Sequence, residues 1–447
     1  MVSAAEQLAA NLNFGAFAKA DDLKRRIYFT LGALIVYRFG TFIPLPGINP
    51  VAFAQTFNAN ASGILGMFNM FAGGAVERMA IFALNIMPYI SASIIMQLMS
   101  SMSPKLEALK KEGEQGRKQI NQYTRYLTVV LAAFQAYGIA IGLEGSQGAA
   151  GPVVMDPGWF FRITTVITLV GGTLFLMWLG EQITARGVGN GISLIIFAGI
   201  IAELPSALVG TLELGRQGAL STVLIISLFV MAVIVVAVIV FMERAQRRLL
   251  VQYPKRQVGN RMFQGDASHL PLKLNTAGVI PPIFASSLLL LPITVANFSA
   301  GGPDWLTTTT AMLGRGQPLH ILIYVALIIF FAFFYTAVVF NPKDTAENLK
   351  KYGGFLPGIR PGERTAEYID YVLTRITAVG ALYLAAVCVL PELLISYWGV
   401  PFYFGGTSLL IVVSVTMDTV AQVQSHLLAH QYEGLIKRTR LRGARRR

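Results

Sequence analysis

Long apolar runs, separated by shorter polar segments, make up most of the chain. A helix of about 20 residues spans the ~30 Å hydrocarbon core of a bilayer, and each run has about that length. In lipid, a lone segment must satisfy its own backbone hydrogen bonds, so the runs are expected to be helices. The ten predicted spans cover residues 27–46, 79–101, 126–143, 160–180, 192–209, 220–242, 276–298, 319–340, 376–398 and 404–424.

The distribution of charge predicts the orientation. Charged residues make up 13% of the 447 residues, against about 25% in a typical soluble domain. The net charge is +13, and the basic residues gather at the two ends and in alternate loops; the exceptions are Arg38, in the first span, and Arg78, Arg162, Arg216 and Arg315. Because short loops rich in Lys and Arg stay in the cytoplasm, both termini are predicted to be cytoplasmic. The same charge is expected to attract anionic lipids.

Two short segments suggest an internal repeat. The second span contains PYISASII at 88–95, and the seventh contains PIFASSLL at 282–289. An odd number of spans per half would invert the second half in the membrane and make these two helices equivalent. A chance match is the alternative, since proline and small residues are common in membrane helices. Small residues let helices approach closely, which favours a separable helix pair.

The predicted fold class is therefore an all-α polytopic membrane protein, with ten transmembrane helices in two pseudo-symmetric inverted halves of five. The first half covers residues 27–214 and the second covers 215–424. A cytoplasmic amphipathic segment, 1–26, precedes them, and a basic cytoplasmic tail, 425–447, follows.

The predicted spans contain few ionisable or catalytic side chains. Glu203, Glu243, Glu392 and Asp418 all lie towards the ends of predicted spans, and no phosphate-binding GxxxxGK[ST] motif occurs. The single cysteine, Cys388, excludes an intramolecular disulfide, and the histidines lack the spacing of a metal site. We expect neither a cofactor nor catalysis. A secondary transporter with inverted repeats is the alternative function, but it normally needs ionisable groups near the midplane.

Isoleucines recur at helical spacing in two spans, at Ile86 and Ile90 and at Ile192 and Ile196. Ordinary packing explains such pairs, but aliphatic side chains can also seal a pore by excluding water.

The connection between the first two spans is apolar but too short to cross the membrane. It is rich in methionine and is broken by Gly73 and Gly74. It is expected either to re-enter a cavity as a removable stopper or to form a static cover on the outer face.

Seven motifs, spread along the chain, resemble the SecY family of protein translocase subunits. They are IPLPGI (43–48), MFNMFAGGA (67–75), MPYISASIIMQL (87–98), GVGNGISLIIFAGI (187–200), HLPLKLNTAGVIPPIFASS (269–287), NPKDTAENLKKYGGFLPGIRPGERTAEYID (341–370) and FGGTSLLIVVSVTMDTVAQVQS (404–425). The resemblance implies an hourglass-shaped channel in the bacterial inner membrane, which is not itself an enzyme. Unfolded secretory proteins cross it, and transmembrane segments leave it sideways into lipid.

The resemblance also assigns residues to parts of the channel. The implied pore ring is Ile86, Ile90, Ile192, Ile196, Ile283 and Ile411. The implied plug, at about 64–74, contains Ile64, Leu65, Met67, Phe68, Met70, Phe71, Gly73 and Gly74. The implied lateral gate lies between the second and seventh spans and contains Ser91, Ser93, Gln97, Ser286 and Ser287. Asn85 departs from the glycine expected before the ring, which leaves the local helix bend open.

The cytoplasmic loops at about 243–274 and 341–375 are longer than the connections of about 2 to 8 residues usual between packed helices, so we expect them to dock partners. The implied docking residues are Arg360, Arg244, Arg247, Arg248, Lys255 and Arg256. A planar guanidinium suits carboxylates and RNA phosphates. The implied partners are SecE and SecG in a heterotrimer, the SecA motor ATPase, the ribosome, signal peptides and nascent chains, with SecDF and YidC as further candidates.

Overall fold

The computed structural model describes residues 20–60, 69–145, 147–148, 151–218, 221–253, 256–258, 261–263, 267–297, 317–398 and 406–444. The chain divides into two compact units. Unit 1 comprises Met1–Ala92, Thr124–Pro205 and Ile411–Arg447, and unit 2 comprises Ser93–Tyr123 and Ser206–Leu410. The sequence-based division into halves at 27–214 and 215–424 stays a prediction.

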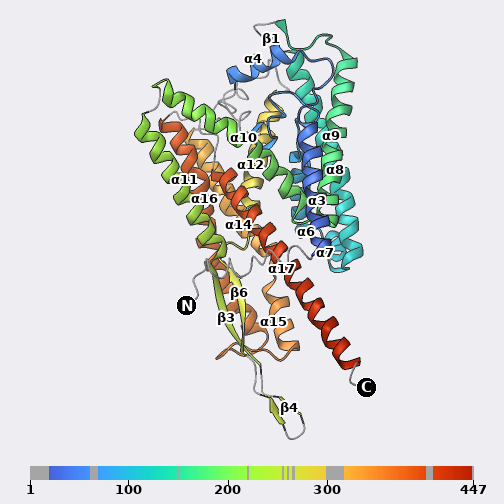
Figure 1. The fold of residues 1–447 in the computed structure, drawn as a ribbon, viewed down its shortest axis with the longest axis vertical. Coiled ribbons are helices and arrows are strands. Elements are labelled where there is room, and N and C mark those ends of the chain that lie inside the picture. Colours follow the sequence, from blue (N-terminus) through green and yellow to red (C-terminus); the bar gives the residue numbers. More distant parts are fainter. Residues whose placement is uncertain are drawn as a thin grey trace. The chain divides into compact units, whose positions relative to one another are not determined.

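Helices dominate both units (Figure 1). They are α3 (Asp21–Gly40), α4 (Pro50–Asn60), α6 (Met87–Met102), α7 (Pro104–Lys111), α8 (Glu114–Glu144), α9 (Trp159–Arg186), α10 (Gly191–Arg216), α11 (Thr222–Arg244), α12 (Ile280–Asn297), α14 (Pro318–Val339), α15 (Pro342–Lys351), α16 (Glu363–Trp398) and α17 (Gly406–Ala444). Within the described residues, 7 helical stretches are long and apolar enough to cross a membrane. Each of the predicted spans overlaps a helix, but the count of ten crossings and their orientation stay predictions.

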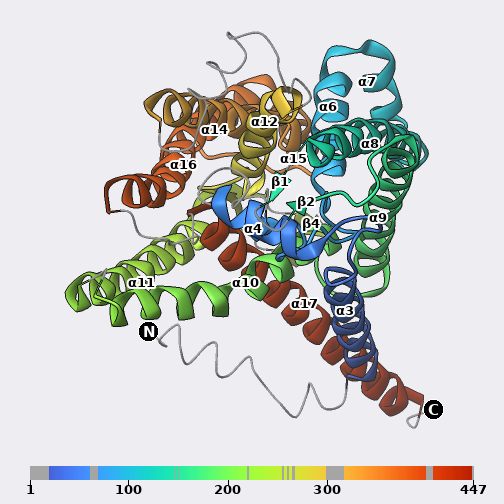
Figure 2. The same ribbon diagram turned by 90° about the horizontal axis from the view of Figure 1, so that it is seen from above.

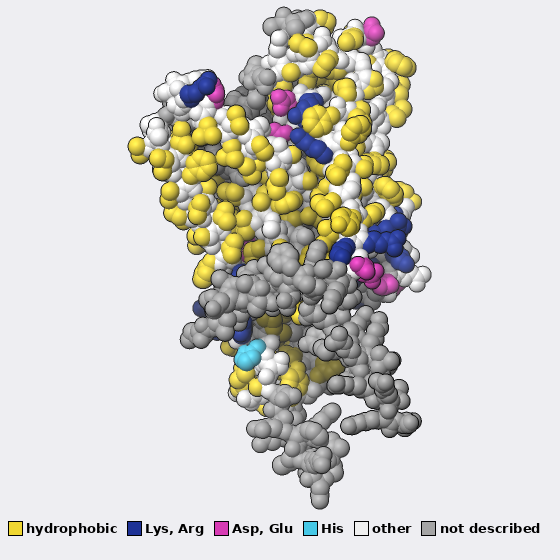
Figure 3. Space-filling model, in the orientation of Figure 1, with side chains coloured by type: hydrophobic (Ala, Val, Ile, Leu, Met, Phe, Trp, Pro, Cys, Tyr) yellow, Lys and Arg dark blue, Asp and Glu magenta, His cyan; other side chains and the backbone are white. Residues whose placement is uncertain are grey.

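Large hydrophobic side chains remain exposed on these helices, as Figure 3 shows for one face of the molecule. On α11, for example, Val223, Val233 and Phe241 are all exposed. A helix that is apolar on every side is typical of a membrane environment, because exposing it to water would be unfavourable. The described helices therefore support the expectation that this is a polytopic membrane protein.

Several helices begin or end at other residues than the predicted spans, and two of them bear on the site. The helix of the first span, α3, begins at Asp21 and ends at Gly40 rather than near residue 46. Asp21 and Asp22 stabilise its first turn, because carboxylates interact favourably with the positive end of the helix dipole. The helix of the second span, α6, begins at Met87 rather than near residue 79, since the preceding residues form turns.

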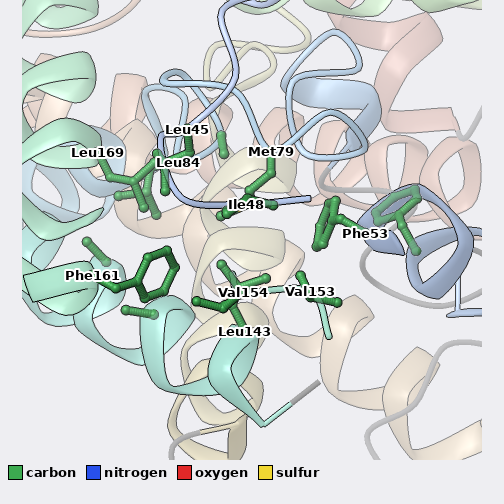
Figure 4. Packing of buried hydrophobic residues seen from close by; sticks show 14 of the residues in the cluster. Leu45, Ile48, Phe53, Met79, Leu84, Leu143, Val153, Val154, Phe161 and Leu169 are labelled. Carbon is green, nitrogen blue, oxygen red and sulfur yellow. The ribbon is translucent and has the colours of Figure 1, made fainter. Parts of the chain in front are cut away.

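The core of unit 1 joins the segment after α3 to α4, α8 and α9. Figure 4 shows Leu45, Ile48 and Phe53 packed with Val153, Val154 and Phe161. Backbone pairing strengthens this packing, since the amide of Asn49 donates to the carbonyl of Val153 at 2.9 Å. This core lies beside the turns that lead into α6, because Met79 and Leu84 belong to the same cluster.

Unit 2 contains a helical group and a lobe with β-structure. Helices α12, α14 and α16 pack together (Figure 2). In the lobe, β3 (Gln246–Gln252) pairs antiparallel with β6 (Ala267–Lys273), and β4 (Arg256–Val258) pairs antiparallel with β5 (Arg261–Phe263). A third pair, β1 (Gln147–Gly148) and β2 (Gly151–Pro152), belongs to unit 1.

The strict all-α prediction is therefore wrong in the first large loop, 243–274. Strand β3 alternates exposed and buried side chains over its second half, which is the period of a half-buried strand. Leu249 and Val251 face a core that also contains Leu356 and Ile369, so the two large loops fold as one lobe. Hereafter this lobe, 246–273 with 342–376, is called the hairpin lobe.

Candidate functional site

A buried turn forms the last part of the segment predicted to be a plug. It comprises residues 69–75, and Met70, Phe71, Ala72 and Ala75 are all buried. Gly73 and Gly74 have φ of +63° and +79°, a backbone conformation that glycine adopts without steric cost. The Gly74 amide donates to the Asn69 carbonyl at 3.0 Å and closes the turn. Met70, Phe71, Gly73 and Gly74 thus lie in a compact buried segment.

The remaining predicted plug residues cannot be placed. Ile64, Leu65, Met67 and Phe68 lie outside the described residues. The role of this segment as a plug stays a prediction.

Three side chains hold three consecutive carbonyls of the buried turn. The Asn85 amide donates to the Phe71 oxygen at 2.5 Å, the Tyr37 hydroxyl to the Ala72 oxygen at 3.3 Å, and an Arg38 guanidinium nitrogen to the Gly73 oxygen at 2.5 Å. Buried carbonyls need such partners, because unpaired polar groups away from water are costly. Tyr37 and Arg38 come from the last turn of α3, and Asn85 lies two residues before α6.

Asn85 adopts the backbone conformation that glycine would provide. Its φ is +49°, and asparagine is among the residues that tolerate the left-handed region best. The question left open by the sequence is therefore answered: the chain bends at Asn85, and α6 begins after the bend. Unlike glycine, Asn85 also has a side chain, which is 2% exposed and reaches the buried turn.

Helix α10 approaches the same turn closely. A Cβ atom added at Gly199 would lie 2.6 Å from the Phe71 oxygen, and one added at Gly73 would lie 3.0 Å from the Gly199 Cα atom. These two glycines therefore allow backbone to pack on backbone. The Glu203 carboxylate and the Arg78 guanidinium both lie beside Gly74.

Glu203 lies at a different place in its helix than the sequence predicted. It was expected near the end of a span, but α10 continues to Arg216, so Glu203 lies near the middle of the helix. Glu203, Arg38 and Arg78 together place charged groups beside the buried turn. The guanidinium groups of Arg38 and Arg78 also lie 4.8 and 4.4 Å from the centre of the Phe42 ring. The pattern analysis missed the roles of Tyr37, Asn85 and Glu203 here, although an asparagine in place of glycine was a signal.

The predicted pore ring divides between the two units. Ile86, Ile90, Ile192, Ile196 and Ile411 belong to unit 1, whereas Ile283 belongs to unit 2. Four of them, Ile86, Ile90, Ile196 and Ile411, are buried, and Ile192 and Ile283 are half-buried. The Ile90 amide donates to the Ile86 carbonyl at 3.0 Å, so this pair shares the first turn at the start of α6.

The predicted gate residues lie on α6 and α12, all in the early turns except Gln97, which lies in the second half of α6. Pro88 and Pro282 both fall in the first turn of their helices, where a proline costs no helical hydrogen bond. Pro88 is the second residue of α6 and Pro282 the third of α12, and the equivalence of the two matched segments stays a prediction. The hydroxyls of Ser286 and Ser287 both donate to the Ile283 carbonyl, at 2.9 and 2.8 Å.

On α6, Ser91 is buried and Ser93 is half-buried. The Gln97 amide donates to the Ser93 hydroxyl at 3.4 Å. All five predicted gate residues have small or polar side chains on helices that are mostly apolar.

The predicted docking residues lie in or beside the hairpin lobe. Arg244 ends α11, Arg247 and Arg248 lie on β3, and all three are exposed. Arg360 is also exposed, between Gly358 and Gly362 with φ of +79° and +111°. The Thr365 hydroxyl donates to the Arg360 carbonyl at 3.0 Å, which fixes the turn that presents its side chain.

Lys255 lies outside the described residues, and Arg256 is described only as part of β4. Among the residues that were placed, no group of three or more His, Cys, Asp or Glu side chains could hold a metal ion.

Comparison with known proteins identifies the family. The SecY family model matches residues 80–420. The protein translocase subunit SecY of Rickettsia conorii is 58% identical over 422 residues, which cover 94% of this chain and 98% of that protein. Two solved channels share the fold at 18% identity, covering 90% of this chain and 92% of each: a SecY studied for its plug domain, with a TM-score of 0.64, and Sec61 in the canine ribosome-channel complex, with a TM-score of 0.60. The chain is a member of the SecY family.

Proposed function

We propose that this chain is the channel subunit through which unfolded secretory proteins cross the bacterial inner membrane. The observation that carries the proposal is the 58% identity to a protein translocase subunit over nearly the whole length of both chains. The apolar helices and the buried turn beside α3, α6 and α10 agree with a channel that is closed at rest. On this proposal the chain is not an enzyme, and partners supply the energy.

In the proposed channel, the pore ring of isoleucines forms the seal and the lateral gate opens towards lipid. Aliphatic side chains make few specific hydrogen bonds, so Ile90, Ile283 and Ile411 can close around any unfolded sequence and still exclude water. We place the plug at about 64–74 and the lateral gate between α6 and α12, through which transmembrane segments pass into lipid. Ten crossings with both termini cytoplasmic complete this arrangement.

The proposed partners engage the cytoplasmic side. Exposed arginines on the hairpin lobe, led by Arg360, are suited to carboxylates and to RNA phosphates. We assign this surface to the SecA motor ATPase and to the ribosome, in line with the ribosome-bound Sec61 that shares the fold. SecE and SecG would complete the heterotrimer, and SecDF and YidC would act beside it.

Reconstitution tests the proposed function. The chain, purified with its two small partner subunits, is placed in vesicles with the motor ATPase, and protease-protected secretory precursor is measured. The proposal predicts import that requires ATP, and the same amount of protected precursor with and without ATP would contradict it. A test of proton-driven or sodium-driven solute uptake by the same vesicles addresses the transporter alternative.

A further inference from the structure

We infer that Asn85 couples the start of α6 to the release of the buried turn, as one member of a three-residue clasp formed with Tyr37 and Arg38. This inference rests on the proposed function, because it concerns how the closed channel opens. The clasp is the set of side-chain hydrogen bonds from these three residues to the carbonyls of Phe71, Ala72 and Gly73.

The clasp is suited to reversible release. The carbonyls of residues 71–73 accept from these side chains, and the Ala72 oxygen also accepts from the Ala75 amide at 3.3 Å, a bond that lies within the turn itself. Releasing the side chains therefore breaks no hydrogen bond of a helix or a sheet. Water can replace side-chain donors at a carbonyl when the turn enters a wet cavity. Opening therefore exchanges hydrogen bonds rather than leaving buried groups unpaired, which would be much more costly.

The position of Asn85 sets it apart from the other two donors. Tyr37 and Arg38 are neighbours in the last turn of α3, so they move with that helix. Asn85 lies at a left-handed backbone position directly before α6, which begins at Met87. A movement of the start of α6 away from α3 would break the bond to Phe71 first. Its neighbour Ile86 belongs to the proposed ring, so one movement would both widen the ring and weaken the clasp.

Asn85→Gly tests the coupling cleanly. Glycine keeps the positive φ that the bend requires and removes only the side chain. Tyr37→Phe removes the second donor and retains the aromatic ring. The hydrogen bond from Tyr37 to Ala72 is longer than the one from Asn85 to Phe71. Thr165→Val is the matched control: it also removes a buried polar atom from unit 1, but the Thr165 hydroxyl, on α9, has no hydrogen-bond partner among the described residues.

The alkylation rate of a cysteine placed in the turn measures how often the turn opens. In a Cys388→Ala background, Met70→Cys places a single thiol at a buried position of the turn. The complete translocase in vesicles, without precursor, is treated with a maleimide reagent present on both sides of the membrane. If alkylation requires opening, its rate follows the population of the open form.

The inference predicts that Asn85→Gly accelerates alkylation about tenfold, which corresponds to about 1.4 kcal/mol at 25 °C. Tyr37→Phe should accelerate it by a smaller factor, and Thr165→Val should leave it unchanged. An unchanged rate in Asn85→Gly would overturn the clasp, and so would an equal acceleration in Thr165→Val, which would indicate general loosening. Failure of the parent chain to import precursor would count against the proposed function instead, because the alkylation rates do not depend on import.

Discussion

Gln252 and Phe355 exchange a pair of backbone hydrogen bonds, each with an N···O distance of 2.9 Å. Gln252 ends strand β3, and Phe355 lies in the loop between α15 and α16, about a hundred residues later in the chain. Their pairing joins the two large loops of unit 2 into the hairpin lobe. A lobe with its own core can present exposed arginines from both loops on one folded support.

The hairpin lobe should depend on Leu249 far more than on Leu250. These neighbours on β3 point to opposite sides, with exposed fractions of 6% and 37%. Leu249→Ala is expected to destabilise the lobe by about 2–5 kcal/mol, because it leaves a cavity in the core. Limited proteolysis of the purified complex should then cut the lobe much faster. Leu250→Ala is the matched control, and equal cleavage of the two variants would contradict the described packing.

Arg360 should be needed for motor-driven export but not for folding. It is exposed in a turn fixed by the Thr365 hydrogen bond, so Arg360→Glu should leave the amount of protein in the membrane unchanged. We expect ATP-driven import to fall by about 30-fold, the loss of roughly 2 kcal/mol typical of an interface hot spot. Arg364→Glu is the control, since Arg364 is exposed on the same lobe and pairs with Glu367 at 3.4 Å. Normal import with Arg360→Glu would refute the docking assignment.

Ile90→Asn should loosen the closed channel. Burying an amide without a hydrogen-bond partner costs about 1–3 kcal/mol, so the closed state would lose that much relative to an open, wetter state. We expect cells with this variant to export precursors whose signal peptides are defective. Ile90→Val keeps the position aliphatic and should retain selectivity. If Ile90→Asn also rejects defective signals, the ring has been assigned to the wrong residues.

The proposed lateral gate makes a prediction about crosslinking. In a Cys388→Ala background, Ser91→Cys and Ser287→Cys together should form a disulfide on mild oxidation, because the gate assignment puts α6 beside α12. The oxidised protein is expected to retain ATP hydrolysis by the motor but to release few transmembrane segments into lipid. Reduction should restore release. A protein that never forms the disulfide, or that releases segments normally once crosslinked, would argue against this gate.

Much of the helical layout could be predicted from hydrophobic pattern. Every predicted span overlaps a helix, because lipid-facing segments must satisfy their backbone internally. The start of α6 could not be predicted, since Met79 and Asn85 adopt positive φ within an apolar stretch that reads as continuous helix. Strand β3 was also missed, because its alternation covers few residues and its arginines suggested a polar loop.

The candidate site was only partly predictable. The apolar segment containing Met70 and Phe71 could be expected to be buried, because it is too short to cross the membrane. Its contacts with Tyr37, Asn85 and α10 depend on tertiary packing between distant parts of the chain. Glu203 was misjudged because hydrophobicity alone ended its span too early. The pairing of distant residues has no local signature in one sequence.

The central claim, that polypeptides pass through the isoleucine ring, is tested most directly by photocrosslinking to a precursor arrested during import. A photoreactive amino acid is placed in turn at Ile90, at Ile411 and at Ile283, which belongs to the other unit, and at the exposed α11 residue Val233 as a control. The account predicts adducts with the arrested precursor from all three ring positions and none from Val233. Absence of adducts from the ring positions, in vesicles where the arrested precursor is present, would contradict it.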